Sequence, residues 1–180
     1  MKIIVRKMPQ MVLDKSFEQL NGKYEICFNG NAMETFMKSI EMSENDDCLN
    51  LEDDIVLCDN FLEKVNEVIK QYPDKIISFF TLKKRPMGIN IERGKTFCMN
   101  QCVYIPKKRN KALLKYQPVW MKSKRGIENP TGYDYLMGDL MDLLNETYVL
   151  YQPSLVQHME MKSRINPKRS SKRQSKTFIK

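Results

Sequence analysis

Hydrophobic and polar positions in the first half of the chain follow two alternating periods. Short apolar runs bounded by turn residues predict strands, and apolar residues three or four positions apart predict helices. The predicted strands are residues 2–6, 24–28, 48–54 and 75–82. The predicted helices are residues 10–20, 32–42 and 61–72. A strand–helix order of this kind predicts an α/β fold, with a mostly parallel central sheet and helices on both faces.

The second half of the chain has a less regular pattern. Strands are predicted at residues 96–106 and 147–153, and helices at residues 107–116 and 133–146. Residues 83–95 and 121–132 are polar, lack a clear period and are expected to be loops. In mostly parallel sheets, ligands bind at the carboxyl ends of the strands. The residues that follow each predicted strand are therefore the first candidates for a site.

Three consecutive acids, Glu52, Asp53 and Asp54, follow the most strand-like apolar run of the chain. Two carboxylates separated by one residue at a strand exit can both reach one ion. Mg²⁺ and Mn²⁺ prefer hard oxygen ligands and bridge carboxylates to phosphates. The same acids could instead begin a turn or precede a helix cap, so the triplet alone leaves both interpretations open.

Further candidates lie late in the chain. The only histidine, His158, follows the last predicted strand and could add a nitrogen ligand to the same ion, or it could be an ordinary loop histidine. Lys162, Ser163 and Arg164 come next and suit phosphate oxygens. Asp134 opens a predicted helix, where it could act as a general base or merely favour the helix dipole.

Composition narrows the class of protein. A length of 180 residues, with 42% hydrophobic and 29% charged residues, predicts one globular domain. No apolar run is long enough for a membrane span, and the N-terminus does not resemble a signal peptide, which predicts a cytoplasmic protein. The five cysteines form no CxxC pair, and neither a GxGxxG sequence nor a P-loop is present. A nucleotide would therefore have to be held by other means, such as a metal.

The charge is concentrated at the C-terminal end. The chain has 30 basic and 22 acidic residues, and residues 162–180 contain eight of the basic residues and no acid. The chain thus divides into a neutral body, residues 1–161, and a basic tail, residues 162–180. Such a tail favours a polyanion, namely a diphosphate, a nucleic acid or an acidic membrane surface. It could also be a solvated end without a partner.

Two stretches together resemble a known family. The segment "CLNLEDDIVLCDNFLEKV" resembles the acidic, DXD-like signature of nucleotide-sugar glycosyltransferases with the GT-A fold, and "PSLVQHMEMKS" is similar to their closing segment. The trailing "RINPKRSSKRQSKTFI" is similar to the Arg/Ser-rich end of small phage-type members. The resemblance implies a GT-A-like catalytic domain over residues 1–161, and a metal-dependent transfer of sugar from a nucleoside diphosphate, in particular a UDP-sugar.

The resemblance also implies roles for individual residues. Glu52 and Asp54 match the flanking positions of the motif that binds Mn²⁺ or Mg²⁺, with Asp53 between them, and His158 matches the late histidine. Arg6 lies in a segment similar to the first strand and loop that contact the nucleotide.

The remaining implied roles concern the two reacting groups. Lys162, Ser163 and Arg164 would support the leaving diphosphate, and Asp53 would help Glu52, Asp54 and His158 to hold the metal on it. Asp134 lies loosely where inverting members place the catalytic base.

The acceptor is the most open part of the prediction. Basic residues outside the tail, together with the phage-type resemblance, favour DNA that carries a hydroxymethylated base, reached by base flipping in the host cytoplasm. These residues are Lys83, Lys84, Arg85, Lys107, Lys108 and Arg109. The alternatives are a cell-surface polysaccharide or lipid-linked saccharide acceptor, a non-catalytic nucleic-acid-binding protein, and a nucleotidyltransferase. The sequence leaves the sugar, the stereochemical outcome and the oligomeric state open.

Overall fold

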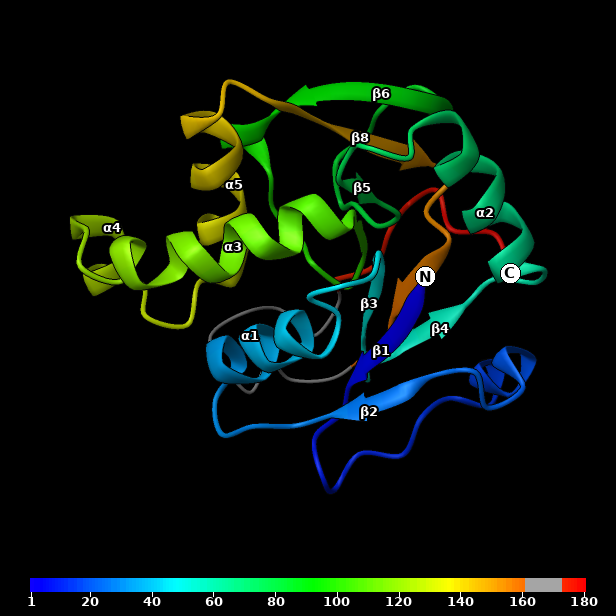
Figure 1. The fold of residues 1–180 in the computed structure, drawn as a ribbon. Coiled ribbons are helices and arrows are strands. Elements are labelled where there is room, and N and C mark those ends of the chain that lie inside the picture. Colours follow the sequence, from blue (N-terminus) through cyan, green and yellow to red (C-terminus); the bar gives the residue numbers. More distant parts are fainter. Residues whose placement is uncertain (161–172) are drawn as a thin grey trace.

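The computed structural model describes residues 1–160 and 173–180, and Figure 1 shows their arrangement. Within these residues, one sheet has the strand order β2-β1-β3-β7-β5-β8-β6, and β4 pairs with β9 in a second, smaller sheet. The strands are β1 (Lys2–Arg6), β2 (Glu25–Cys27), β3 (Cys48–Glu52), β4 (Ile55–Leu57), β5 (Ile77–Ser78), β6 (Gly88–Arg93), β7 (Cys102–Ile105), β8 (Thr147–Gln152) and β9 (Val156–His158).

Helices cover both faces of the large sheet. They are η1 (Lys15–Leu20), α1 (Ala32–Met42), α2 (Phe61–Gln71), η2 (Gly94–Thr96), α3 (Lys107–Trp120), α4 (Lys124–Glu128) and α5 (Tyr133–Leu143). In Figure 1, α1, α3, α4 and α5 lie on one side of the sheet and α2 lies on the other. Five of the seven strands run in one direction, while β7 and β6 run in the other. The predicted α/β class with a mostly parallel sheet is therefore confirmed.

Two apolar clusters fill the space on either side of the sheet. Successive strand residues point to opposite faces, so Tyr104 of β7 packs toward η1 and α2 whereas its neighbour Val103 packs toward α1, α3 and α5. The same alternation separates Val149 from Leu150 in β8. Since both faces are buried, the inner strands are mostly apolar, which is the pattern that predicted them from the sequence.

The two best-predicted helices begin in different ways. At α1, the Asn31 side chain accepts a hydrogen bond from the Glu34 amide, and the Glu34 carboxylate accepts one from the Asn31 amide, which forms a capping box. At α2, Asn60 occupies the cap position with a left-handed φ of 55° and no side-chain capping bond. The Phe61 amide donates instead to the side chain of Gln19 in η1, at 3.0 Å. A side chain from η1 thus takes the place of a local side-chain cap at α2.

Several predicted boundaries are wrong. Residues 83–95, expected to be a loop, contain β6, and residues 121–132 contain α4. The strand predicted at residues 75–82 shortens to Ile77–Ser78, and the helix predicted at residues 10–20 becomes the short η1. β6 is an edge strand that pairs with β8 alone and keeps most of its side chains half-exposed, so its sequence lacks the apolar run of an inner strand.

Among the helices of residues 1–160 and 173–180, none combines the length and the apolar character that a membrane span requires.

Candidate functional site

Polar side chains gather where the parallel strands β1 and β3 end. Arg6 is the last residue of β1 and pairs in register with Glu52, the last residue of β3. Asp53 and Asp54 then form the turn into β4. His158 ends β9 and pairs with Ile55 at the start of β4, so the small sheet brings the late histidine to the acidic turn. The predicted convergence of the acids and His158 is therefore present in the structure.

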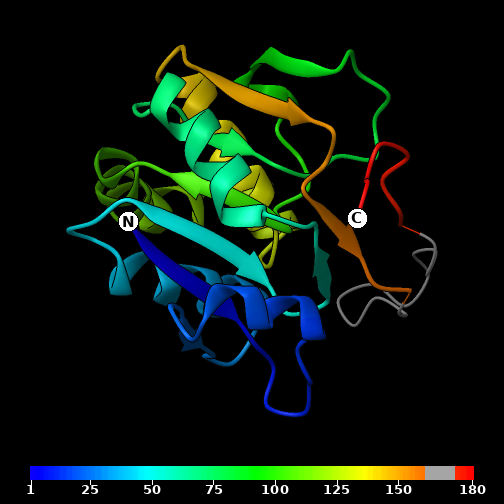
Figure 2. The ribbon, with the colours of Figure 1, turned by 90° about the vertical axis from the view of Figure 1, so that its right-hand side faces the viewer.

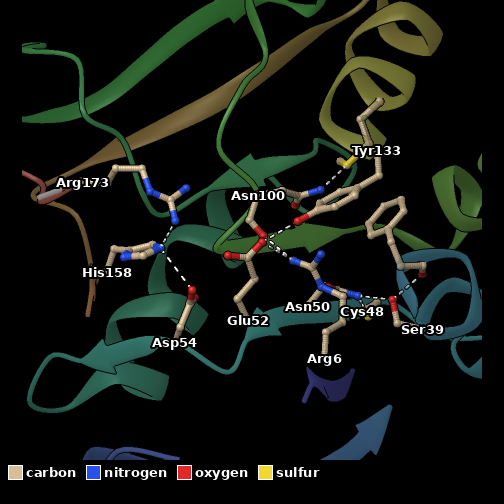
Figure 3. A network of polar contacts seen from close by, with 12 residues as sticks. Arg6, Ser39, Cys48, Asn50, Glu52, Asp54, Asn100, Tyr133, His158 and Arg173 are labelled. Atoms are coloured by element: carbon tan, nitrogen blue, oxygen red, sulfur yellow. Dashed lines mark hydrogen bonds and ion pairs between the residues drawn. The ribbon is translucent and has the colours of Figure 1, made fainter. Parts of the chain in front are cut away.

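Glu52 is held by residues of the protein core. The Tyr133 hydroxyl donates a hydrogen bond to Glu52 Oε1 at 2.6 Å, and Arg6 Nη2 lies 3.5 Å from the same oxygen. Arg6 also donates to the Asn100 carbonyl oxygen. The guanidinium lies over two aromatic rings, 5.5 Å from the centroid of Phe36 and 4.8 Å from that of Tyr133. Figure 3 shows this group on one side of Glu52.

Burial dominates the electrostatics of this group. Desolvation raises the pKa of Glu52 and the neighbouring Asp54 raises it further, although the positive charge of Arg6 acts in the opposite direction. Burial by itself would lower the pKa of Arg6, but Tyr133 and Glu52 keep that pKa above its ordinary value. Arg6 is therefore a buried cation that depends on Glu52 for its countercharge.

Asp54 has a different set of partners. Its Oδ2 lies 3.2 Å from His158 Nε2, and the other ring nitrogen, Nδ1, lies 2.6 Å from the Met159 carbonyl oxygen. The Met159 amide in turn donates to the Asp54 carbonyl oxygen at 2.8 Å. Arg173 from the C-terminal segment places Nη2 2.6 Å from His158 Nε2. Figure 3 shows these three side chains on the opposite side of Glu52 from Arg6 and Tyr133.

The pKa values in this second group shift in opposite directions. Burial would raise the pKa of Asp54, but the hydrogen bond and charge of His158, and the charge of Arg173, leave it below its ordinary value. Burial would lower the pKa of His158, but Asp54 raises it above the ordinary value. Both shifts favour the charged forms of the pair.

Of the other predicted site residues, Asp53 and Asp134 lie in the described part of the chain. Asp53 is buried, and its Oδ2 accepts a hydrogen bond from the Met8 amide at 2.7 Å, which ties the acidic turn to the loop after β1. Asp134 lies in the first turn of α5, one residue after Tyr133, and its Oδ1 accepts from the Tyr135 amide at 3.1 Å. The remaining predicted ligands, Lys162, Ser163 and Arg164, lie outside the described residues.

The chemistry of Asp54 and His158 fits part of a divalent metal site. Asp54 Oδ1 is buried and has no hydrogen-bond partner among the described residues. His158 Nδ1 faces a backbone carbonyl, an arrangement that commonly orients Nε2 toward a metal. Within the same residues, no three His, Cys, Asp or Glu side chains form a complete ligand cluster. A metal held by Asp54 and His158 would thus need further ligands, such as Glu52 after a side-chain shift, or phosphate oxygens of a substrate.

Three residues of this site were not predicted from the sequence: Tyr133, Asn100 and Arg173. The only sequence signal for Tyr133 was its position next to Asp134, and the only signal for Arg173 was its membership of the basic tail. Several buried polar atoms around the site also lack a hydrogen-bond partner in the described part of the chain. They are Arg6 Nε, Asp54 Oδ1, Asn100 Oδ1, Gln101 Oε1 and Arg173 Nε. Such a concentration is typical of a place that binds water, ions or a ligand.

Comparison with known proteins provides information on the fold alone. No protein-family model and no curated protein matches the chain. The structure is similar to the crystal structure of A197 from STIV, with a TM-score of 0.56 and 11% sequence identity over 88% of this chain and 86% of that chain. This similarity supports the α/β class described above.

Proposed function

We propose that the protein is a metal-dependent glycosyltransferase with a GT-A-like fold, which transfers a sugar from a UDP-sugar to an acceptor hydroxyl. The observation that carries the proposal is the pairing of Asp54 with His158 at the carboxyl end of β3, with one Asp54 oxygen buried and without a hydrogen-bond partner in the described residues. The family resemblance of the two segments that supply these residues gives the reaction class.

Each residue of the site has a proposed role. Asp54 and His158 would hold Mn²⁺ or Mg²⁺, and Glu52 stands beside them, held in position by Arg6 and Tyr133. The bound metal would offset negative charge on the departing nucleoside diphosphate.

The protein would supply the remaining groups as follows. Asp53 would keep the acidic turn in place through its bond to the Met8 amide. Lys162, Ser163 and Arg164 would contact the phosphates. Asp134, in the first turn of α5 and one residue after Tyr133, would accept the proton of the acceptor hydroxyl.

The proposed acceptor is DNA with a hydroxymethylated base. Exposed cations are available for its phosphates, whereas Arg109 is paired with Glu146 and Arg85 with Glu92. The exposed lysines of α3 and of the loop before β6 are Lys107, Lys108, Lys111, Lys115, Lys83 and Lys84. Phosphate contacts of this kind make affinity fall steeply with salt.

The donor site is tested by thermal shift with nucleoside diphosphates and their sugars, with and without Mn²⁺. A ligand at a hundred times its Kd stabilises the folded state by about 2.7 kcal/mol. We expect a shift that needs both UDP and metal and that Asp54→Ala removes. Asp59→Ala, which removes an exposed acid from the same stretch, is the matched control. An equal shift in Asp54→Ala would make the acidic turn purely structural.

The acceptor is tested by DNA binding and by transfer assays. We expect the protein to bind hydroxymethylated duplex DNA, with an affinity that falls with salt and falls further in a Lys107→Gln/Lys111→Gln variant. Sugar transfer to a polysaccharide or lipid-linked saccharide, without DNA binding, would replace the DNA acceptor. Salt-dependent DNA binding without any response to nucleotides would instead indicate a non-catalytic binding protein.

A further inference from the structure

The Nε2 atom of His158 contacts two groups that require opposite hydrogen-bonding roles from it. A carbonyl oxygen only accepts hydrogen bonds, so Nδ1, 2.6 Å from the Met159 oxygen, carries a hydrogen. Nε2 then faces Asp54 Oδ2 at 3.2 Å, which requires a donor, and Arg173 Nη2 at 2.6 Å, which requires an acceptor. Because a single ring nitrogen cannot donate and accept at once, one of these two contacts is always incomplete.

Arg173 therefore lies at the site as a countercharge without a full set of hydrogen bonds. Its Nε atom is buried and has no hydrogen-bond partner among the described residues. Its charge nevertheless acts on Asp54 and helps to keep the pKa of that carboxyl low. A guanidinium in this position offsets negative charge on the acidic turn, while Asp54 Oδ1 has no hydrogen-bond partner among the described residues.

The segment that carries Arg173 is attached to the small sheet. The Ser175 amide donates to the Gln157 side chain at 2.7 Å, and the Ser175 hydroxyl donates to Ser154 Oγ at 2.8 Å. Phe178 packs against the cluster that includes η1 and α2. Figure 2 shows residues 173–180 beside β9. Arg173 is thus delivered to His158 by a docked strap, defined here as residues 173–180.

A divalent metal at this pair would need the His158 Nε2 atom that Arg173 now contacts. A metal bound by Asp54 Oδ1 and His158 Nε2 would stand within a few ångströms of a like charge, which is strongly unfavourable in a partly buried site. We propose that Arg173 is a built-in cation that occupies the Asp54–His158 pair until a divalent metal displaces it, and that the displacement loosens the strap. This inference about Arg173 rests on the proposed function, because that function requires a metal at the Asp54–His158 pair.

Calorimetric titration of Mn²⁺ into the full chain tests the competition directly. Arg173→Gln removes the competing charge and should bind Mn²⁺ about tenfold more tightly than the unaltered protein, a difference of about 1.4 kcal/mol. Arg173→Lys keeps the charge and should bind like the unaltered protein. Lys176→Gln removes an exposed cation from the same strap and is the matched control, with no expected change.

Hydrogen exchange supplies a second measurement that does not depend on catalysis. Mn²⁺ should accelerate exchange of the Ser175 amide in the unaltered protein, because its bond to Gln157 loosens when Arg173 leaves. In Arg173→Gln the same amide should exchange at one rate with and without Mn²⁺. Thermal unfolding of each variant confirms that the remainder of the protein stays folded.

Failure of this inference and failure of the proposed function give different results. If Asp54→Asn abolishes Mn²⁺ binding but Arg173→Gln binds Mn²⁺ no more tightly than the unaltered protein, the metal site stands and the competition is refuted. If Mn²⁺ binding is undetectable in every variant, or is the same in Asp54→Asn, the metal is not at this pair, and both the inference and the metal-dependent function are overturned.

Discussion

The two ends of the acidic turn differ in what surrounds them. Glu52 is surrounded by core residues, and both its side chain and that of Arg6 are largely buried, with 16% and 5% exposed. Asp54, two residues later, is 25% exposed and faces groups from β9 and the strap. In the described part of the chain, the partners at the Glu52 end come from β1, α5 and the loop before β7. The spacing of carboxylates in the sequence therefore does not distinguish an acid that supports the fold from one that is available to a ligand; the neighbours do.

The strongest test of this difference is Glu52→Gln. The substitution leaves the buried Arg6 guanidinium without its countercharge, and breaking a buried ion pair from one side costs about 3 kcal/mol or more. We expect a loss of this size in the free energy of unfolding, measured by urea denaturation. Asp54→Asn should lose less, about 1 kcal/mol, because its partner His158 can give up its proton whereas Arg6 cannot. Equal losses in the two variants would remove the distinction between the two ends.

Tyr133→Phe tests the same end more finely. The variant keeps the ring stacked on Phe36 but loses the hydrogen bond to the Glu52 carboxylate, worth about 2 kcal/mol for a charged acceptor. Its loss should be smaller in the Glu52→Gln background, because the Gln oxygen still accepts from Tyr133 but more weakly than a carboxylate does. A double-mutant cycle in urea measures this coupling, and strict additivity would show that Tyr133 acts independently of Glu52.

The contribution of Asp54 and His158 to the stability of the fold should depend on pH. The folded pKa of Asp54 is lowered, so its stabilisation is present above its unfolded pKa of about 3.9 and is lost as the pH falls through the folded pKa. The folded pKa of His158 is raised, so its stabilisation is present below its unfolded pKa of about 6.5 and is lost as the pH rises through the folded pKa.

The two effects together define a window. The unaltered protein should exceed Asp54→Asn in stability by about 1 kcal/mol between about pH 4 and 6.5, and by less on either side. Urea denaturation of both proteins across this range, in metal-free buffer, measures the difference. A difference that does not change with pH would show that the pair is not ionised in the folded state.

The smallest expected effect concerns the docking of the strap. Ser175→Ala removes the hydroxyl that donates to Ser154 and should cost about 0.5 kcal/mol of global stability. Hydrogen exchange within residues 173–180 should nevertheless accelerate clearly, because the strap can open without unfolding the sheet. A global loss as large as that of Tyr133→Phe would mean that the strap is part of the cooperative core.

Local signals predicted the first half of the fold well. The capping box at Asn31 and Glu34, together with one apolar face, fixed α1 at the predicted residues 32–42, and β1 agrees with the predicted 2–6. β6 was not predicted, because an edge strand does not need apolar residues on both of its faces. β9 was too short to recognise, although it positions His158.

The candidate site could be predicted only in part. The acids and the histidine were found because they follow apolar strands. Tyr133 lies 81 positions from Glu52, and nothing in the sequence links the two. The partners of a buried charge are set by how the helices pack on the sheet, which local patterns do not encode. The candidate ligands Asp54 and His158 could therefore be predicted from the sequence, but the residues that hold Glu52 and Arg6 in position could not.

The order of strands in the sheet has a consequence for synthesis on the ribosome. β7 enters between β3 and β5, and β8 enters between β5 and β6, although both are made after their neighbours. At about 5–20 residues per second, a nascent chain waits several seconds between the translation of β6 and that of β8. During this interval β5 and β6 have unpaired edges that can pair with other chains. The newly made chain, rather than the finished fold, is therefore the form most exposed to aggregation and most dependent on chaperones.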